Sequence, residues 1–177
     1  DDDEAPTMEW RAEITVDDGA NGIGRTAATL GIEHTQEFDL LGVRRDGHML
    51  PPDTPIEADD VMIFQATEKG VKALWGSPRF GTSAQRLYAA SVASGQQGSM
   101  RELGGEGDFT VIAARTAEPL RDTPALAGQT CFVTTDDPGA LQDSSAIALW
   151  QNAAGKAPQP AKTRKAVAIL LAVIIAA

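Results

Sequence analysis

The sequence predicts an α+β protein made of two small tandem domains, and three observations lead to this prediction. Short apolar segments rich in β-branched residues alternate with turns that contain glycine and proline. The same series of strand-like and helix-like segments occurs twice. The 177 residues suffice for one medium domain or two small ones. Each domain is expected to run strand, helix, strands, helix.

The predicted elements follow one another in the same order in both halves. The first half is expected to contain strands at 10–16, 38–44 and 61–65, a short helix at 25–30 and a closing helix that begins near Glu68. The second half is expected to contain strands at 87–93, 109–115 and 130–134, a short helix at 99–103 and a closing helix near Asp137. Asp46-Gly47 predicts a two-residue hairpin turn after the second strand.

Internal matches in a fixed order indicate a duplication. Segment 38–44 matches 109–115, Asp53-Thr54-Pro55 recurs as Asp122-Thr123-Pro124, 58–64 matches 127–133, and 12–16 resembles 89–93. We therefore predict a first domain at 9–76, a linker at 77–85 and a divergent second domain at 86–150. Domains of about 65 residues bury little apolar surface alone, so they are expected to pack on each other or dimerise.

Composition excludes several classes of protein. The formal charge of −10, from 25 acidic and 15 basic residues, argues against a nucleic-acid partner, which needs a basic face. Cys131 is the single cysteine, so the chain has no internal disulfide and no cysteine-rich zinc module. A reducing compartment fits this composition.

The C-terminal segment differs from the rest of the chain. Residues 166–177 form an unbroken apolar run of 12 residues, shorter than the roughly 20 needed to cross a bilayer. Lys156, Lys162, Arg164 and Lys165 precede it, as on the cytoplasmic side of a membrane helix. We predict a basic linker at 151–165 and the start of a transmembrane helix at 166–177. The alternative is a buried C-terminal helix, although an entirely apolar helix has no polar face for water.

Two stretches of the first half carry a family resemblance. They are Leu41-Gly42-Val43-Arg44-Arg45-Asp46-Gly47 and the following Leu50-Pro51-Pro52-Asp53-Thr54-Pro55-Ile56-Glu57-Ala58-Asp59-Asp60-Val61-Met62-Ile63-Phe64. This pattern resembles the TrkA-C domain, also called the C-terminal RCK domain. In that family a strand ends in Arg-x-Gly, and Ala-Gly-Asp precedes an apolar strand. Asp59 stands where the family has glycine, whereas the second half keeps Gly128 but has Gln129 in place of the acid.

The resemblance implies a role at the membrane. Two tandem TrkA-C domains before a basic linker look like the cytoplasmic insert of permeases similar to the divalent-anion:sodium symporters. It implies a regulatory or assembly domain pair at the cytoplasmic face of the inner membrane. The implied partners are the membrane part of the same transporter, a second copy in a homodimer and a small anionic regulatory ligand. The alternatives are a stand-alone regulatory subunit of a potassium channel or uptake system, and a dimerisation module without a ligand.

No motif in the sequence indicates an enzyme, so we expect no catalytic residue, metal site or cofactor. His34 and His48 lack a metal-ligand spacing and are expected in surface loops. Gly19, Gly22 and Gly24 do not have the spacing of a dinucleotide or phosphate loop and are expected in a turn.

The candidate ligand-binding residues are three arginines. Arg44 and Arg115 end equivalent strands, and Arg45 follows Arg44. A guanidinium group at a strand end can pair with a carboxylate such as that of Asp60, or it can bind an anionic ligand. We favour the structural role and keep the anion site as the alternative.

Overall fold

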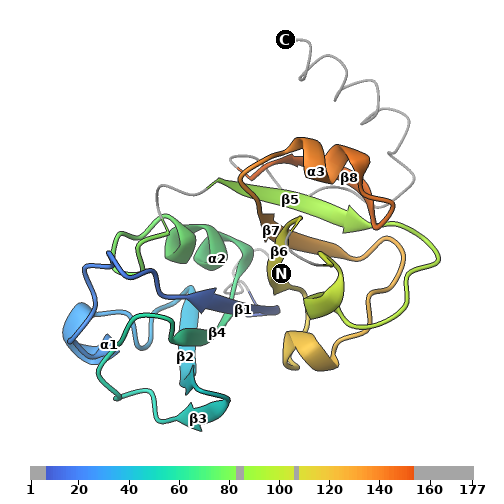
Figure 1. The fold of residues 1–177 in the computed structure, drawn as a ribbon. Helices are drawn as coiled ribbons and strands as arrows, with labels where there is room; N and C mark the ends of the chain where they lie inside the picture. Colours follow the sequence, from blue (N-terminus) through green and yellow to red (C-terminus); the bar gives the residue numbers. More distant parts are fainter. Residues whose placement is uncertain (1–6, 83–85, 106–107, 154–177) are drawn as a thin grey trace. The chain divides into compact units, whose positions relative to one another are not determined.

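The computed structural model describes residues 7–82, 86–105 and 108–153. The chain divides into two compact units, Asp1–Ala84 (unit 1) and Gln85–Ala177 (unit 2), and each is described by itself. The described residues contain eight strands and a few short helices, which confirms the α+β prediction (Figure 1).

Unit 1 contains a four-stranded antiparallel arrangement. Its elements are β1 (Trp10–Thr15), α1 (Ala27–Leu30), β2 (Phe38–Arg45), β3 (His48–Leu50), β4 (Val61–Ala66) and α2 (Glu68–Trp75). The strands lie in the order β3-β2-β4-β1, so β4 pairs with both β2 and β1. All predicted strands of this half are present, and β3 is the short return strand of the predicted hairpin.

The elements of unit 2 are β5 (Leu87–Val92), η1 (Met100–Glu102), β6 (Thr110–Ala114), η2 (Leu120–Asp122), β7 (Thr130–Thr134), α3 (Gly139–Asp143) and β8 (Ile147–Asn152). Three strands of unit 2 lie in the same order as three strands of unit 1: β6, β7 and β5 correspond to β2, β4 and β1. Unit 2 has a further strand, β8, beside β5, where the described residues of unit 1 have none. The strands lie in the order β6-β7-β5-β8, all antiparallel. The sequence did not predict β8. This strand crosses the predicted boundary at 150, so the predicted start of the linker at 151 is wrong by two residues.

The two units share a bulge at corresponding positions. The β2–β4 register shifts between Leu40 and Gly42, and the β6–β7 register shifts between Val111 and Ala113. These are the positions that the sequence matches aligned. A bulge bends the strand and inserts one residue without moving the flanking pairs to the other face.

The first strands also correspond, but one residue away from the sequence match. The N–H of Val16 donates to the carbonyl of Asp60 at 2.8 Å, and the N–H of Val92 donates to the carbonyl of Gln129 at 2.9 Å. Val16 therefore corresponds to Val92. The match of 12–16 with 89–93 was therefore wrong by one position.

Threonine side chains cap the two helices that the sequence predicted in unit 1. The N–H of Thr29 donates to Oγ1 of Thr26 at 3.3 Å at the start of α1, and the N–H of Gly70 donates to Oγ1 of Thr67 at 3.0 Å at the start of α2. In unit 2 the predicted short helix is a single 3₁₀ turn. It begins after Ser99, whose N–H donates to Oε1 of Glu102 at 2.9 Å.

Helix α2 packs against β1 and β4 and helps to cover one face of the unit 1 sheet (Figure 1). Beneath it, the ring of Phe64 contacts Phe38 and Phe80 edge-on, with centroid distances of 5.5 and 6.0 Å. Phe80 and Thr82 are buried, and Oγ1 of Thr82 donates to the carbonyl of Trp75 at 2.6 Å. The predicted linker 77–85 is thus wrong for 77–82, which belong to the core of unit 1; residues 83–85 lie outside the described ranges.

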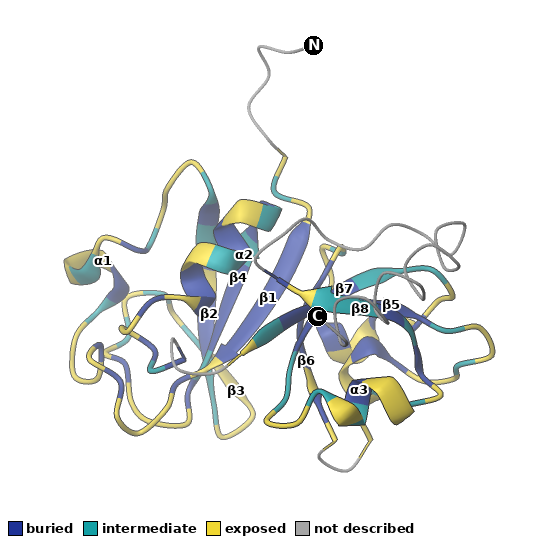
Figure 2. Ribbon diagram, turned by 90° about the horizontal axis from the view of Figure 1, so that it is seen from above, coloured by how far each residue is buried: buried dark blue, intermediate teal, exposed yellow. Residues whose placement is uncertain are grey.

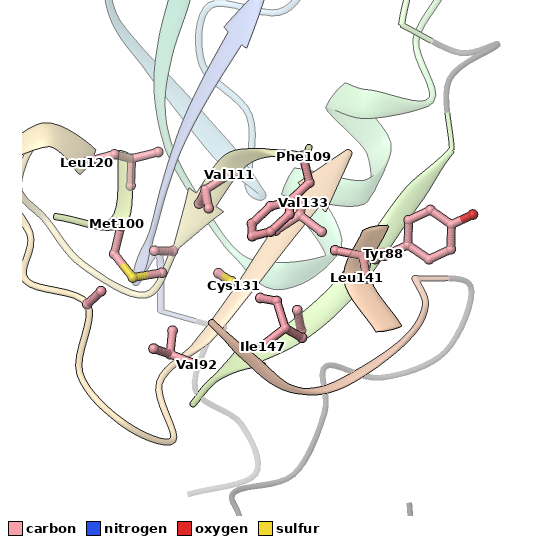
Figure 3. Packing of buried hydrophobic residues seen from close by; sticks show 13 residues of the cluster. Tyr88, Val92, Met100, Phe109, Val111, Leu120, Cys131, Val133, Leu141 and Ile147 are labelled. Carbon is pink, nitrogen blue, oxygen red and sulfur yellow. The ribbon is translucent and has the colours of Figure 1, made fainter. Parts of the chain in front are cut away.

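The core of unit 2 gathers side chains from all four strands and from the loops beside them. Figure 3 shows Met100 and Leu120 beside Val111, and Phe109 beside Val133. The strands are largely buried and the turns are exposed, as Figure 2 shows for both units. Few of these side chains are aromatic, so apolar aliphatic packing carries most of the hydrophobic stabilisation.

In the part of the chain that the structure describes, every helix is too short or too polar to cross a bilayer. The predicted transmembrane segment 166–177 and the linker residues 154–165 lie outside the described residues.

The hairpin turn at Asp46-Gly47 gives the first testable prediction. Both residues have positive φ, 54° and 80°, as a two-residue hairpin of this type requires. Valine is strained in this region, so Gly47→Val should lower the free energy of unfolding by about 1–3 kcal/mol. Urea denaturation monitored by tryptophan fluorescence measures the change.

The matched control for this turn is Gly47→Asn, because asparagine enters the left-handed region readily. It should cost less than half as much as Gly47→Val. Equal stability of Gly47→Val and the wild type would contradict the turn geometry.

Candidate functional site

Arg45 and Asp60 form the centre of a polar cluster at the end of β2. Nε and Nη2 of Arg45 donate to the two carboxylate oxygens of Asp60 at 2.8 and 2.7 Å. Nη2 also donates to the carbonyl of Pro55 at 2.9 Å, and Nη1 lies 3.1 Å from the carboxylate of Glu57. One guanidinium group therefore ties the strand end to the connection between β3 and β4.

Asp60 is held in its charged form although its side chain is only 1% exposed. Burial alone would raise the pKa of this carboxyl group, but the hydrogen bonds from Arg45 and from the N–H of Glu57, at 2.9 Å, outweigh it. The pKa of Asp60 is lowered, and the same pair raises the pKa of Arg45. The two groups form a charge-assisted pair with two parallel hydrogen bonds, the strongest type of such contact.

Arg44 has a different carboxylate partner from the one that the sequence suggested. Its Nη2 donates to Oε1 of Glu13 at 3.3 Å, and the Glu13 side chain is buried. Arg44 thus pairs with a carboxylate, but with that of Glu13; Asp60, the example that the sequence offered, binds the neighbouring Arg45 instead. Arg11 and Glu13 alternate along β1, so both lie on one face of the strand. This alternation is the sequence signal that could have identified Glu13.

Unit 2 holds the corresponding turn without charges. Thr116 stands at the position of Arg45, and Gln129 stands at the position of Asp60. Oε1 of Gln129 accepts the N–H of Leu126 at 3.3 Å, as Asp60 accepts the N–H of Glu57. The arginine and the carboxylate are thus replaced together, which avoids leaving a buried charge unpaired.

Arg115, the third candidate, is exposed and directly follows β6. The position that corresponds to Glu13 is Ala89, which is buried in β5. The carboxylate that binds Arg44 therefore has no counterpart at Arg115. The structure does not bring Arg115 together with Arg44 and Arg45 in one unit.

The histidines form no metal centre. Both are exposed as predicted, although His48 lies in β3 rather than in a loop. Nδ1 of His34 lies 3.0 Å from Oδ1 of Asp39, a contact that the sequence reasoning missed. Among the described residues, no group of three or more His, Cys, Asp or Glu side chains is arranged so that it could hold a metal ion. Burial raises the pKa of Cys131 to about 12, so its thiol stays protonated and unreactive at neutral pH.

The glycine cluster is a turn, as predicted. The N–H of Gly22 donates to the carbonyl of Arg79 at 2.9 Å, and the N–H of Gly24 donates to the carbonyl of Ile56 at 2.7 Å. A phosphate loop needs such N–H groups directed at the ligand. Here the N–H groups of Gly22 and Gly24 already donate to backbone carbonyls, so they are not directed at a ligand.

A groove in unit 2 is the second candidate site, and the sequence did not predict it. Thr110, Thr134 and Ala140 line it together with Asp108, Asp136 and Asp137, and its volume is about 350 Å³. We call it the β6–α3 groove. Oγ1 of Thr135 donates to the carbonyl of Asp108 at 2.8 Å and fixes one wall.

No protein-family model, curated protein or solved structure matches this chain.

The ion pair of Arg45 and Asp60 gives the second testable prediction. Asp60→Asn removes the charge but keeps the shape, so it should lower the free energy of unfolding by about 1.5–3 kcal/mol. Glu57→Gln, at the exposed partner, should cost less than about 1 kcal/mol. Urea titrations at pH 7 measure both variants.

The loss in Asp60→Asn should depend on pH. The folded-state pKa of Asp60 lies below the value of about 3.9 in an unfolded chain, so the pair stabilises the fold above that pH. The contribution is lost as the pH falls through the folded-state pKa. The difference between wild type and variant should therefore shrink below about pH 4, and a difference that stays constant down to pH 2 would contradict the pairing.

Proposed function

We propose that the two units are tandem TrkA-C-like domains that serve as the cytoplasmic regulatory and assembly part of a membrane transporter. The observation that carries the proposal is the agreement between the two units in three features: the order of their strands, the position of the bulge, and the turn that precedes the central strand, which is β4 in unit 1 and β7 in unit 2. Asp59 and Gly128, the residues at the family's glycine position, both have positive φ, 69° and 82°. A glycine requirement at this position has a physical reason, because an L-residue is strained there.

The polar cluster supports an assembly role more than ligand sensing at the arginines. Arg44 and Arg45 already contact Glu13 and Asp60, so an anion would have to displace a carboxylate from each guanidinium. Such a displacement would leave a buried carboxylate without its partner. A small anionic ligand at Arg44, Arg45 or Arg115 remains the second candidate, and Arg115 is the one that lies exposed.

The exposed apolar side chains of unit 1 support a homodimer formed through this unit. Leu41 is 45% exposed at the bulge of β2, and Met49 is 60% exposed on β3. Leu40, Gly42 and Val43 are buried, so Leu41 is the residue that the bulge leaves exposed. The Sδ atom of the exposed Met49 packs against Gly42, the next residue after Leu41. Two large apolar side chains exposed on one hairpin favour a protein contact there.

Membrane association is the third testable prediction. The native protein from its source cells should sediment with membranes and stay there after a carbonate wash, because the spanning helices of the proposed transporter would anchor it in the bilayer. Immunoblotting of the fractions with an antibody against unit 1 gives the readout. Recovery in the carbonate-soluble fraction would overturn the transporter proposal and favour a separate regulatory subunit.

Dimerisation is the fourth testable prediction. Sedimentation velocity of the chain in a neutral detergent should give a dimer at tens of micromolar, and Met49→Glu should convert it to a monomer. Leu126→Glu is the matched control. Leu126 is 63% exposed in unit 2 and corresponds to Glu57, so glutamate is already accepted at this position of the turn. A wild-type monomer, or equal effects of both variants, would contradict assembly through unit 1.

A further inference from the structure

The β6–α3 groove lies where unit 2 differs from unit 1. The residue that corresponds to Ala140 is Val71, which lies in α2 and is fully buried. Helix α3 has five residues where α2 has eight. The smaller side chain and the shorter helix leave an open volume of about 350 Å³ at the end of β7, near the lower limit of common ligand clefts.

The chain leaves the described fold at the same end of this sheet. The N–H of Ala153, just after β8, donates to the carbonyl of Leu87 at 3.0 Å. Leu87 is in turn paired with Thr134, which lines the groove. Neighbouring strands lie about 4.8 Å apart, so the end of β8 is roughly 10 Å from the groove wall.

The groove and the following segment carry opposite charges. Asp108, Asp136 and Asp137 line the groove and are exposed. The next residues of the chain contain four cations and no acid, namely Lys156, Lys162, Arg164 and Lys165. Lys156 follows Ala153 by three residues, and an extended chain covers about 10 Å in three residues. Three extended residues after Ala153 would therefore be long enough to span the distance to the groove wall.

We propose that the β6–α3 groove binds the basic segment 156–165 of the same chain. The occupant is this segment because it starts within reach, has the complementary charge and is tethered. The tether raises its effective concentration to the millimolar range, so weak ion pairs suffice for occupancy. The proposal does not depend on the transporter assignment, since it uses only the path of the chain and the charges.

Disulfide cross-linking in the full chain tests the proposal. The only native cysteine, Cys131, is buried and does not react, so pairs of introduced cysteines report cleanly. Ala140→Cys places a thiol in the groove, and Ala157→Cys places one beside Lys156. In neutral detergent with a mild oxidant at low salt, this pair should form its disulfide at least tenfold faster than the control pair.

The control pair is Leu126→Cys with Ala157→Cys. Leu126 is exposed and precedes β7, whereas the groove lies at the other end of this strand. Adding Asp108→Asn and Asp136→Asn to the groove pair should reduce its rate to that of the control, and 0.5 M salt should do the same by screening. Thermal unfolding of each variant verifies that unit 2 is folded.

Two results would overturn the proposal. Equal rates for the groove pair and the control pair would show that the segment does not visit the groove. A fast groove pair that is insensitive to both aspartate substitutions and to salt would show that charge does not select the occupant.

Discussion

Both units depend on the turn through which the chain enters its central strand. In unit 1 this turn places Asp59 at positive φ, and the N–H of Asp59 and the carbonyl of Asp60 both bond to Val16. The same bonds in unit 2 join Gly128 and Gln129 to Val92. Because β4 and β7 pair with strands on both sides, a slip of one residue at this turn would invert the faces of the central strand.

The two versions of the turn show that the geometry does not require charge. An amide oxygen at Gln129 accepts the turn N–H as the carboxylate of Asp60 does. What the charged version adds is the contact of Arg45 with the carbonyl of Pro55, which holds a longer connection against the strand. An arginine beside a glycine-containing turn is therefore a weak indicator of a ligand site, since a buried carboxylate explains it equally well.

The strands and turns could be predicted from sequence because periodicity, the Asp-Gly pair and the internal matches agree with one another. Strand β8 could not, since Ile147–Asn152 has no counterpart in the first half and no turn signal as strong as Asp46-Gly47 before it. The partner of Arg44 was missed because cross-strand contacts depend on strand order, which local patterns do not determine. The groove was missed for a similar reason: it results from the short helix α3 and from Ala140, and neither has a motif.

The hairpin of β2 and β3 also limits how the protein can aggregate. Strand β3 is the last strand of its sheet and has only three residues. Pro51 and Pro52 follow it at once, and proline has no N–H to offer to an additional strand. Such an edge resists templated growth into fibrils. The hairpin therefore presents its side chains to the surroundings but offers little free backbone for another strand to pair with.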